Sequence, residues 1–290
     1  MDYRISNEFL TVTVSSLGGE LMSVTSPDGT EFIWQGDPTF WKKRAPHLFP
    51  VVGRLTQGRC TLEGEVCQMD THGFFRWRPM ALQSQGPGRL TLSMDWDRET
   101  YEQYPRHWHG ELEYALEGKT LSITFRVENQ DQRPMWFAYG GHPGFQVPLE
   151  KELAFEDYRL RFQENCRPVC VGMTDACFVG GEDSPLPLEG SELPLRHALF
   201  DRDALVLRGA GREVTLYSPK GTHQVTVSFP RMSYLGLWHA PNTQAPYLCI
   251  EPWTALPSRQ DVVEELSRRE DFLRLAAGET YENTWSIAFD

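Results

Sequence analysis

The chain has 290 residues, of which 40% are hydrophobic and 23% are charged, a composition typical of a globular protein with an apolar core. Its 28 basic and 40 acidic residues give a formal net charge of −12, which argues against nucleic acid or an anionic membrane as a general partner. No apolar run reaches the roughly 18 residues of a membrane-spanning helix, and residues 1–10 do not resemble a signal peptide. We therefore expect a cytoplasmic protein.

The chain is predicted to be a succession of β-strands. Apolar and polar residues alternate over short segments, and glycine-containing turns separate them, which is the pattern of half-buried strands. Such a succession is typical of an antiparallel sandwich or barrel. The segments span residues 8–34 (with a turn at Asp28-Gly29), 59–69 (with a turn at Glu63-Gly64), 89–96, 112–129, 204–218 and 223–230.

Helix is scarce in this pattern. One helix is predicted over residues 258–271, where Ser258 and Asp261 resemble a capping box and Val262 and Leu266 share a face. Residues 180–195 are predicted to form a long surface loop. No repeat, low-complexity tract or linker is visible, so residues 1–290 are predicted to form a single all-β domain with few short helices.

The cysteines do not indicate a disulfide scaffold or a metal centre. There are six in 290 residues, and no Cys-x-x-Cys pair occurs. Cys166, Cys170 and Cys177 lie close together, but their spacing fits no standard zinc pattern. We expect reduced structural thiols and no metal site.

Three regions break the strand pattern by placing an ionisable residue beside glycine or proline and among aromatic residues. No glycine-rich nucleotide-binding motif and no Gly-x-Ser-x-Gly motif occurs, which disfavours nucleotide binding and serine-hydrolase chemistry. The three regions are residues 47–55 leading to 70–79 with His72, residues 136–145 with His142, and residues 248–258 with Glu251.

Glu251 follows the apolar run "YLCI" and precedes Pro252, so it is predicted to lie at the end of a buried strand where pairing stops. Partial desolvation raises the pKa of a carboxyl group and suits it to act as a general base. A salt-bridged or helix-capping glutamate fits the same position. The residue alone leaves both interpretations open.

His142 lies in "GGHPGF", where Pro143 favours an extended backbone and the glycines permit tight turning and close approach of a ligand. Histidine exchanges protons near pH 7. A ring that only hydrogen-bonds to a loop carbonyl is the alternative, and His72 has the same ambiguity. Arg54 and Arg76 fit either substrate binding or structural ion pairs.

His107 and His109 are the only alternate-residue histidine pair, and Glu111 and Glu113 follow them. This arrangement fits a metal-dependent isomerase of the cupin type. A surface strand edge with no metal is the preferred interpretation.

The segments "THGFFR", "GGHPGF" and "CIEPW", in this order, resemble the aldose 1-epimerase (galactose mutarotase-like) family. The segments "LGGELMSV", "FPVVGRL" and "LRLAAGETYENTWSIAF" fit too, so the resemblance covers nearly the whole chain, and "HLFPVVGRL" with "HGFFR" looks most similar to the LacX-type branch. The resemblance implies a large antiparallel β-supersandwich with a cleft on one sheet. It also implies interconversion of the α and β anomers of a sugar, without metal or nucleotide.

The same resemblance assigns roles to particular residues. Glu251 matches the catalytic base, His142 the acid at the ring oxygen, and His72 the second histidine of that region. For the substrate, it implies that Arg54 or Arg76 holds hydroxyls near the anomeric carbon, that Trp238 faces the sugar ring, and that Asp203, in preference to Asp201, binds ring hydroxyls.

The substrate stays open at this point. Gly144-Phe145 replaces the aromatic residue and asparagine of better-known galactose mutarotases, and Arg54, Arg76 and Arg78 also suit a hexose 6-phosphate. A hexose-6-phosphate 1-epimerase and a non-catalytic carbohydrate-binding β-sandwich are the alternatives to an aldose 1-epimerase. The oligomeric state is not indicated.

Overall fold

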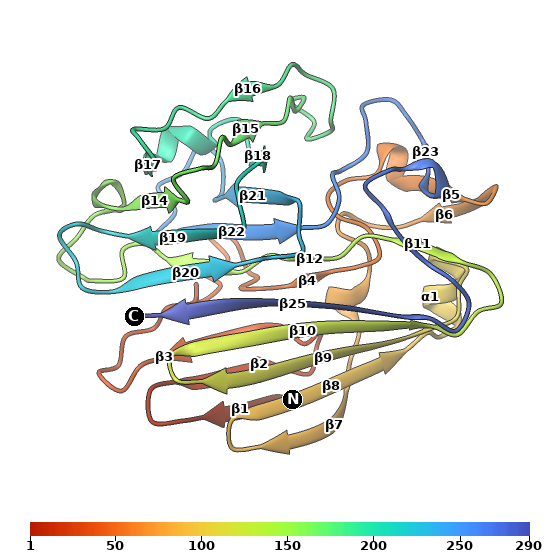
Figure 1. The fold of residues 1–290 in the computed structure, drawn as a ribbon, viewed down its shortest axis with the longest axis horizontal. Coiled ribbons are helices and arrows are strands. Elements are labelled where there is room, and N and C mark those ends of the chain that lie inside the picture. Colours follow the sequence, from red (N-terminus) through yellow and green to blue (C-terminus); the bar gives the residue numbers. More distant parts are fainter.

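In the computed structural model, which describes residues 1–290, the chain forms several antiparallel sheets and one short α-helix (Figure 1). The largest sheet has nine strands: β7 (Ala81–Gly86), β8 (Arg89–Asp95), β9 (Trp108–Glu117), β10 (Thr120–Asn129), β14 (Arg159–Phe162), β17 (Glu192–Pro194), β19 (Glu213–Tyr217), β20 (Gln224–Ser228) and β25 (Thr280–Phe289). Their order is β17-β14-β19-β20-β25-β10-β9-β8-β7. The predicted fold class is confirmed.

A second sheet has eight strands: β4 (His47–Leu48), β12 (Gly140–Gly141), β13 (Gly144–Gln146), β15 (Val169–Cys170), β16 (Ser184–Pro185), β18 (Leu205–Arg208), β21 (Tyr234–Trp238) and β22 (Tyr247–Trp253). Its order is β16-β15-β18-β21-β22-β12-β4, and β13 also pairs with β22. Every residue of β22 is buried, which explains why this segment is a continuous apolar run and not an alternating one.

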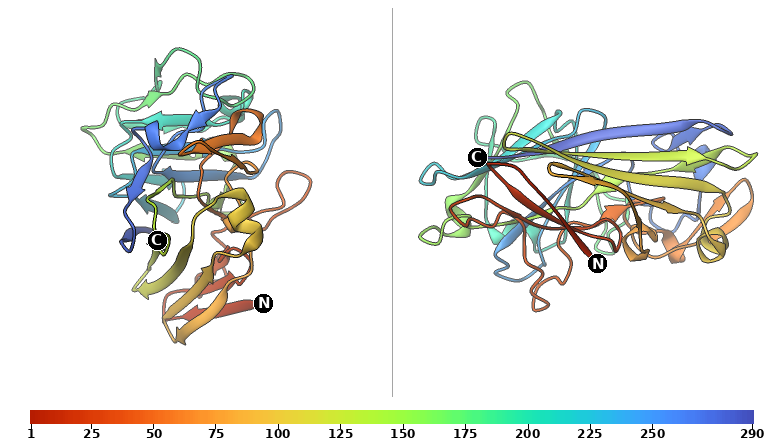
Figure 2. Two further views of the ribbon diagram at one scale, coloured as in Figure 1. Left: turned by 90° about the vertical axis from the view of Figure 1, so that its right-hand side faces the viewer. Right: turned by 90° about the horizontal axis from the view of Figure 1, so that it is seen from below.

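Three smaller sheets complete the fold. In the view from below (Figure 2, right), the long strands of the nine-stranded sheet run together along one side, and the N-terminal strands cross them at an angle. The small sheets contain β1 (Asp2–Ser6), β2 (Thr11–Ser15) and β3 (Leu21–Thr25); β5 (Arg59–Leu62), β6 (Glu65–Gln68) and β23 (Glu264–Glu265); and β11 (Met135–Phe137) with β24 (Leu273–Leu275).

The predicted helix over residues 258–271 is wrong. This segment contains β23, which pairs in parallel with β5, and a single 3₁₀ turn. The buried Glu264 carboxylate accepts hydrogen bonds from Arg259, and Asp261 has a left-handed φ of 60°, which interrupts a helix. Tertiary contacts therefore override the local helical pattern.

Helix is confined to short pieces elsewhere. The only α-helix is α1 (Arg98–Gln103), and Asp97 and Thr100 form its capping box. None of the helices is long and apolar enough to cross a membrane. The 3₁₀ turns are η1 (Thr56–Gly58), η2 (Phe75–Trp77), η3 (Phe155–Asp157), η4 (His197–Phe200) and η5 (Leu266–Arg268).

The turns and the core agree well with the sequence pattern. Glu63 and Gly64 join β5 to β6 with φ angles of 53° and 84°, as a two-residue hairpin requires, and Ser26 to Thr30 form the predicted turn around Gly29. The main hydrophobic cluster has 68 buried residues, and a second cluster has five. Segment 204–218 differs from a simple hairpin, because β18 and β19 belong to different sheets.

Candidate active site

A cavity of about 330 Å³ lies over one face of the eight-stranded sheet. Val206 of β18, Trp238 of β21, and Glu251 and Trp253 of β22 line it. The register explains this, because Gly236 pairs with Glu251 and is two residues from Trp238, so these residues share one face. All seven predicted site residues line this one cavity: Arg54, His72, Arg76, His142, Asp203, Trp238 and Glu251.

A gap in the sheet brings His142 to Glu251. On one side of β22, Gly140 pairs with Trp253 and pairing resumes at Gly144 with Cys249, so His142 lies in the interruption. The prediction that Glu251 ends its strand is wrong, because β22 continues to Trp253. Successive backbone nitrogens of a strand point to opposite sides. Pro252 is tolerated inside the strand because its nitrogen, which carries no hydrogen, points to the side where pairing is interrupted.

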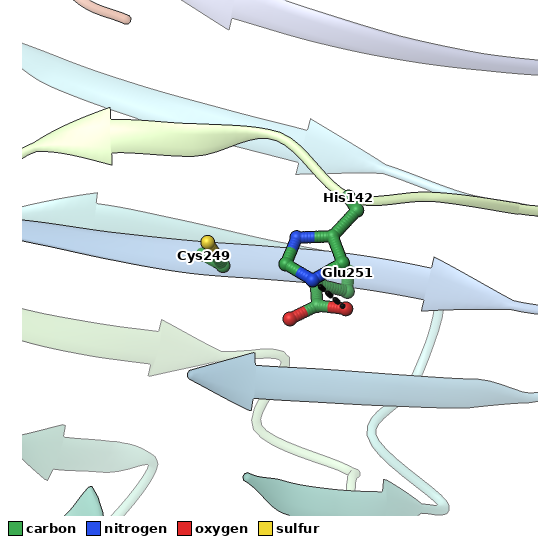
Figure 3. A group of neighbouring side chains, drawn as sticks. All are labelled: His142, Cys249 and Glu251. Atoms are coloured by element: carbon green, nitrogen blue, oxygen red, sulfur yellow. Dashed lines mark ion pairs between the residues drawn. The ribbon is translucent and has the colours of Figure 1, made fainter. Parts of the chain in front are cut away.

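Glu251 and His142 form a close pair whose hydrogen-bonding capacity is not fully used. His142 Nε2 lies 3.2 Å from Glu251 Oε2, and Figure 3 shows the imidazole directed at the carboxylate on β22. Both residues are buried. Neither Glu251 Oε2 nor His142 Nδ1 has a well-aligned hydrogen-bond partner in the protein. Buried polar atoms without partners are costly, and because these two belong to residues that line the cavity, a ligand there can supply the missing contacts.

Burial moves the pKa values of this pair in opposite directions. It raises the pKa of Glu251 well above its usual value, and the negative charge of Asp203 adds to this shift. Burial, with the positive charge of Arg76 nearby, lowers the pKa of His142 to about 3. Burial therefore favours an uncharged pair, a neutral imidazole beside a protonated Glu251 carboxyl.

The glycines of "GGHPGF" have a different role from the one predicted. They were expected to permit close approach of a ligand, but a Cβ on Gly140 would lie 2.8 Å from the ring of Trp253, and one on Gly141 would lie 2.6 Å from the ring of Trp285. These two glycines therefore make room for buried indole rings.

His72 enters the cavity from the segment between β6 and η2. Its Nδ1 accepts a hydrogen bond of 3.0 Å from the backbone N–H of Gly53, so the neutral ring carries its proton on Nε2. Burial and the positive charge of neighbouring groups lower its pKa well below the usual value. His72 also has a left-handed φ of 67°, and its ring meets that of His142 edge-on at 5.4 Å between centroids. The ring is thus a neutral hydrogen-bond donor beside the catalytic candidates.

Three arginines line the cavity, and one of them was not predicted. Arg76 lies deepest: its Nη2 donates to the carbonyl of Thr71, and its buried Nε has no partner. Arg54 lies at the exposed rim, and Arg202, which sequence reasoning missed, also lines the cavity. Arg78, the third arginine suggested from the sequence, is bound elsewhere by Asp97 and Glu99.

Asp203, and not Asp201, lines the cavity. Asp203 has a left-handed φ of 81°, and its Oδ1 accepts a hydrogen bond of 2.8 Å from the backbone N–H of Ala204. Asp201 is exposed, and its carbonyl accepts a hydrogen bond from Asn242. The sequence preference for Asp203 agrees with this placement.

Two tryptophans enclose His142. Trp41 stacks on its ring with centroids 4.8 Å apart, and Trp238 meets the same ring edge-on at 5.8 Å. Trp41 was not predicted, because it lies in an irregular loop without strand periodicity. The walls are therefore flat and apolar, as the faces of a sugar ring require.

One group of side chains offers metal-ligand atoms. His142, Cys249 and Glu251 are buried, and their donor atoms lie within 4.8 Å of one another (Figure 3). Burial raises the pKa of the Cys249 thiol well above its usual value, whereas zinc binds the thiolate. A reaction without metal stays a prediction.

The histidine pair suggested for a cupin-type metal site does not converge on the cavity. His109 is held by Asp95 at 2.7 Å, and the ring of His107 lies 4.0 Å from that of Trp96. The interpretation as a strand edge is also wrong, because β9 lies inside the nine-stranded sheet between β10 and β8.

Comparison with known proteins identifies the family of the chain. The aldose 1-epimerase family profile matches residues 1–288. The LacX protein of Lactococcus lactis subsp. lactis, in its plasmid form, is 30% identical over 297 residues, with 99% of each chain covered.

Solved structures agree. A galactose mutarotase related enzyme from Lactobacillus acidophilus superposes with a TM-score of 0.94 at 30% identity, covering 100% of this chain and 97% of its own. A galactose mutarotase-like protein from Lactobacillus casei gives 0.94 at 28% identity, covering 100% of both chains. A putative aldose 1-epimerase from Escherichia coli K12 shares the fold, with a TM-score of 0.80 at 18% identity. The chain belongs to the aldose 1-epimerase family.

Proposed function

We propose that the protein is an aldose 1-epimerase that interconverts the α and β anomers of a hexose. The observation that supports this best is the buried pair of Glu251 and His142, with unpartnered polar atoms, in an aromatic-walled cavity. Ring opening needs a base at one sugar oxygen and an acid at another, and this pair offers both.

The proposed reaction begins when Glu251, as the carboxylate, takes the proton of the C1 hydroxyl. The C1–O5 bond breaks as the C1 carbonyl forms, and O5 receives a proton from His142. Rotation about the C1–C2 bond presents the other face of the carbonyl. The reverse transfers then close the ring as the other anomer, and the enzyme regains its initial protonation state.

One shared proton suffices for this cycle. The step needs an ionised Glu251 and a protonated His142, which differ from the uncharged pair only by transfer of the proton that Glu251 holds. A sugar hydroxyl that donates to the carboxylate favours its ionised form. His72, with its proton on Nε2, donates beside His142 and orients the sugar oxygen there.

The test is the rate of anomer interconversion of freshly dissolved α-glucose and α-galactose, followed by polarimetry or NMR. Wild type is expected to accelerate the reaction, and Glu251→Gln, which keeps the shape, to lower the rate by about 10²–10⁴-fold. Equal rates in wild type and Glu251→Gln for every sugar would contradict the epimerase proposal and favour a non-catalytic sugar-binding protein.

A hexose 6-phosphate epimerase is the second candidate, because Arg54, Arg76 and Arg202 all line the cavity. Guanidinium groups bind phosphate through paired hydrogen bonds, and Arg76 Nε is without a partner. Glucose and glucose 6-phosphate are therefore compared in the same assay. If the phosphate is bound, Arg202→Ala raises KM for the phosphosugar and not for glucose; equal effects on both sugars would favour the neutral hexose.

A further inference from the structure

A thiol holds the carboxylate that faces the proposed sugar site. Cys177 Sγ donates a hydrogen bond of 3.0 Å to Asp203 Oδ2, and both residues line the cavity. The two residues belong to separate segments, 26 positions apart. The thiol comes from a loop of residues 172–181, which we call the Cys177 loop.

Both partners have an unfavourable backbone. Cys177 has φ of 63° and Asp203 has φ of 81°, in the left-handed region that residues other than glycine rarely adopt. Two strained residues that face each other across one contact are typical of a functional site that the surrounding structure enforces.

The Cys177 loop is anchored independently of the thiol. The backbone N–H groups of Gly180 and Gly181 both donate to the carbonyl of Gly172, at 3.0 and 2.9 Å, and close the loop at its base. Val179 N–H donates to the carbonyl of Ser258 at 3.0 Å, which ties the loop to the neighbouring chain. Loss of the thiol hydrogen should therefore leave the loop in place.

The Asp203 carboxylate is oriented at both oxygens. Oδ1 accepts from the N–H of Ala204, and Oδ2 accepts from the thiol of Cys177. Each carboxylate oxygen has two lone pairs, so each keeps one for a hydroxyl donor in the cavity. Without the thiol, only the contact to the adjacent residue restrains the group, and the side chain can rotate.

We propose that Cys177 is a positioning residue: it holds the Asp203 carboxylate in the orientation that binds one sugar hydroxyl, and thereby sets KM. The inference rests on the proposed epimerase function. It assigns the Cys177 loop to substrate recognition and gives no chemical step to the thiol.

The first experiment compares KM and kcat of wild type, Cys177→Ala and Cys177→Ser. We expect Cys177→Ala to raise KM about threefold to tenfold, the effect of one lost hydrogen bond, with kcat within about twofold. Cys177→Ser keeps a donor and should restore most of the affinity. Cys170→Ala is the control, because Cys170 lies on β15 outside the cavity lining. An unchanged KM in folded Cys177→Ala overturns the inference.

Sugars that lack one hydroxyl separate orientation from general damage. In a panel of monodeoxy hexoses, the one missing the hydroxyl bound by Asp203 should have the same KM in wild type and Cys177→Ala. An equal rise of KM for every sugar would show that the cavity as a whole had changed, and would overturn the inference.

A readout that needs no epimerase activity tests the contact itself. Burial and the hydrogen bond to Asp203 raise the pKa of Cys177 to about 11, so iodoacetamide should alkylate this thiol slowly. Asp203→Asn should speed alkylation of Cys177, measured by peptide mass spectrometry. An unchanged rate overturns the inference even if no sugar is turned over, whereas an inactive wild type with the faster alkylation contradicts only the proposed function. If Cys177→Ala does not fold, Cys177→Ser and this assay decide.

Discussion

Two buried histidines, His47 on β4 and His142 directly after β12, differ in how they are used. His47 lies opposite Gly141 in the ladder between β4 and β12, one residue from His142. Burial lowers the pKa of both rings to about 3. Burial and pKa therefore do not distinguish the two residues.

Their hydrogen bonds do. His47 has a partner at each nitrogen, with Tyr139 Oη 3.0 Å from Nδ1 and Tyr114 Oη 2.7 Å from Nε2. His142 Nδ1 has no partner, and its Nε2 faces only a carboxylate. A buried histidine whose two nitrogens are both hydrogen-bonded has a structural role, whereas one with an unpartnered nitrogen can bind a ligand. Between these two histidines, unused hydrogen-bonding capacity, and not burial, distinguishes the one that lines the cavity.

Of the changes considered, substitution of His142 is expected to have the largest effect. His142→Gln should lower kcat by about 10²–10⁴-fold, because the amide cannot act as the acid at the ring oxygen. The free energy of unfolding should change by no more than about 1 kcal/mol, because His142 Nδ1 has no hydrogen bond that the substitution could remove. Polarimetry and urea unfolding check the two parts. Activity within about threefold of wild type would contradict the assigned role.

Acid should affect both histidines alike. Their folded-state pKa of about 3 lies below the usual 6.5, so only the unfolded chain takes up their protons as the pH falls through this range. The stability linked to these histidines is therefore fully present above pH 6.5. Below that pH the free energy of unfolding declines, by up to about 3 kcal/mol per histidine by about pH 4.5. Urea unfolding across this range should show a shallower decline for His142→Gln than for wild type. Parallel declines would show that His142 does not contribute.

A smaller effect is expected when the satisfied histidine is removed. His47→Leu leaves the hydroxyl of Tyr139 without this partner in the core and should lower stability by about 2 kcal/mol. The kcat of the folded variant should stay within about twofold of wild type, since His47 does not line the cavity. Denaturant unfolding and the anomer assay test this. A loss of kcat comparable to that of His142→Gln would erase the distinction between the two histidines.

The smallest effects are expected for two arginines, of which Arg76 lines the cavity and Arg78 does not. Arg78 forms surface ion pairs with Asp97 and Glu99. Arg78→Gln should therefore lower the free energy of unfolding by less than about 1 kcal/mol and leave KM unchanged. Arg76→Gln, which alters the cavity, should raise KM about tenfold. Steady-state kinetics of both variants provides the comparison, and a matching rise of KM in Arg78→Gln would contradict it.

The sequence predicted the strands well and the single helix poorly. Alternation along β9 and β10 reflects burial of one face and needs only local information. The pattern over residues 258–271 also has helical spacing, but pairing of β23 with β5 and the ion pairs of the buried Glu264 with Arg259 and Arg269 outweigh it. Such partners come from distant segments that a local pattern does not contain.

The candidate site was predicted where motifs mark it and missed where they do not. His72, His142 and Glu251 occur in segments that resemble family motifs, and all three line the cavity. Trp41 and Arg202 lie in irregular segments without periodicity or motif, so nothing in the local pattern identifies them.

The sequence by itself determined that the chain is an all-β protein with sugar-epimerase motifs in order, because strand alternation and short motifs are local properties. Only the tertiary structure decided that β22 continues past Glu251, that the glycines beside His142 accommodate tryptophans, and that a thiol holds Asp203. It also decided which buried atoms lack partners. Each of these depends on atoms from segments far apart in the chain, and the fold alone brings those atoms within hydrogen-bonding distance.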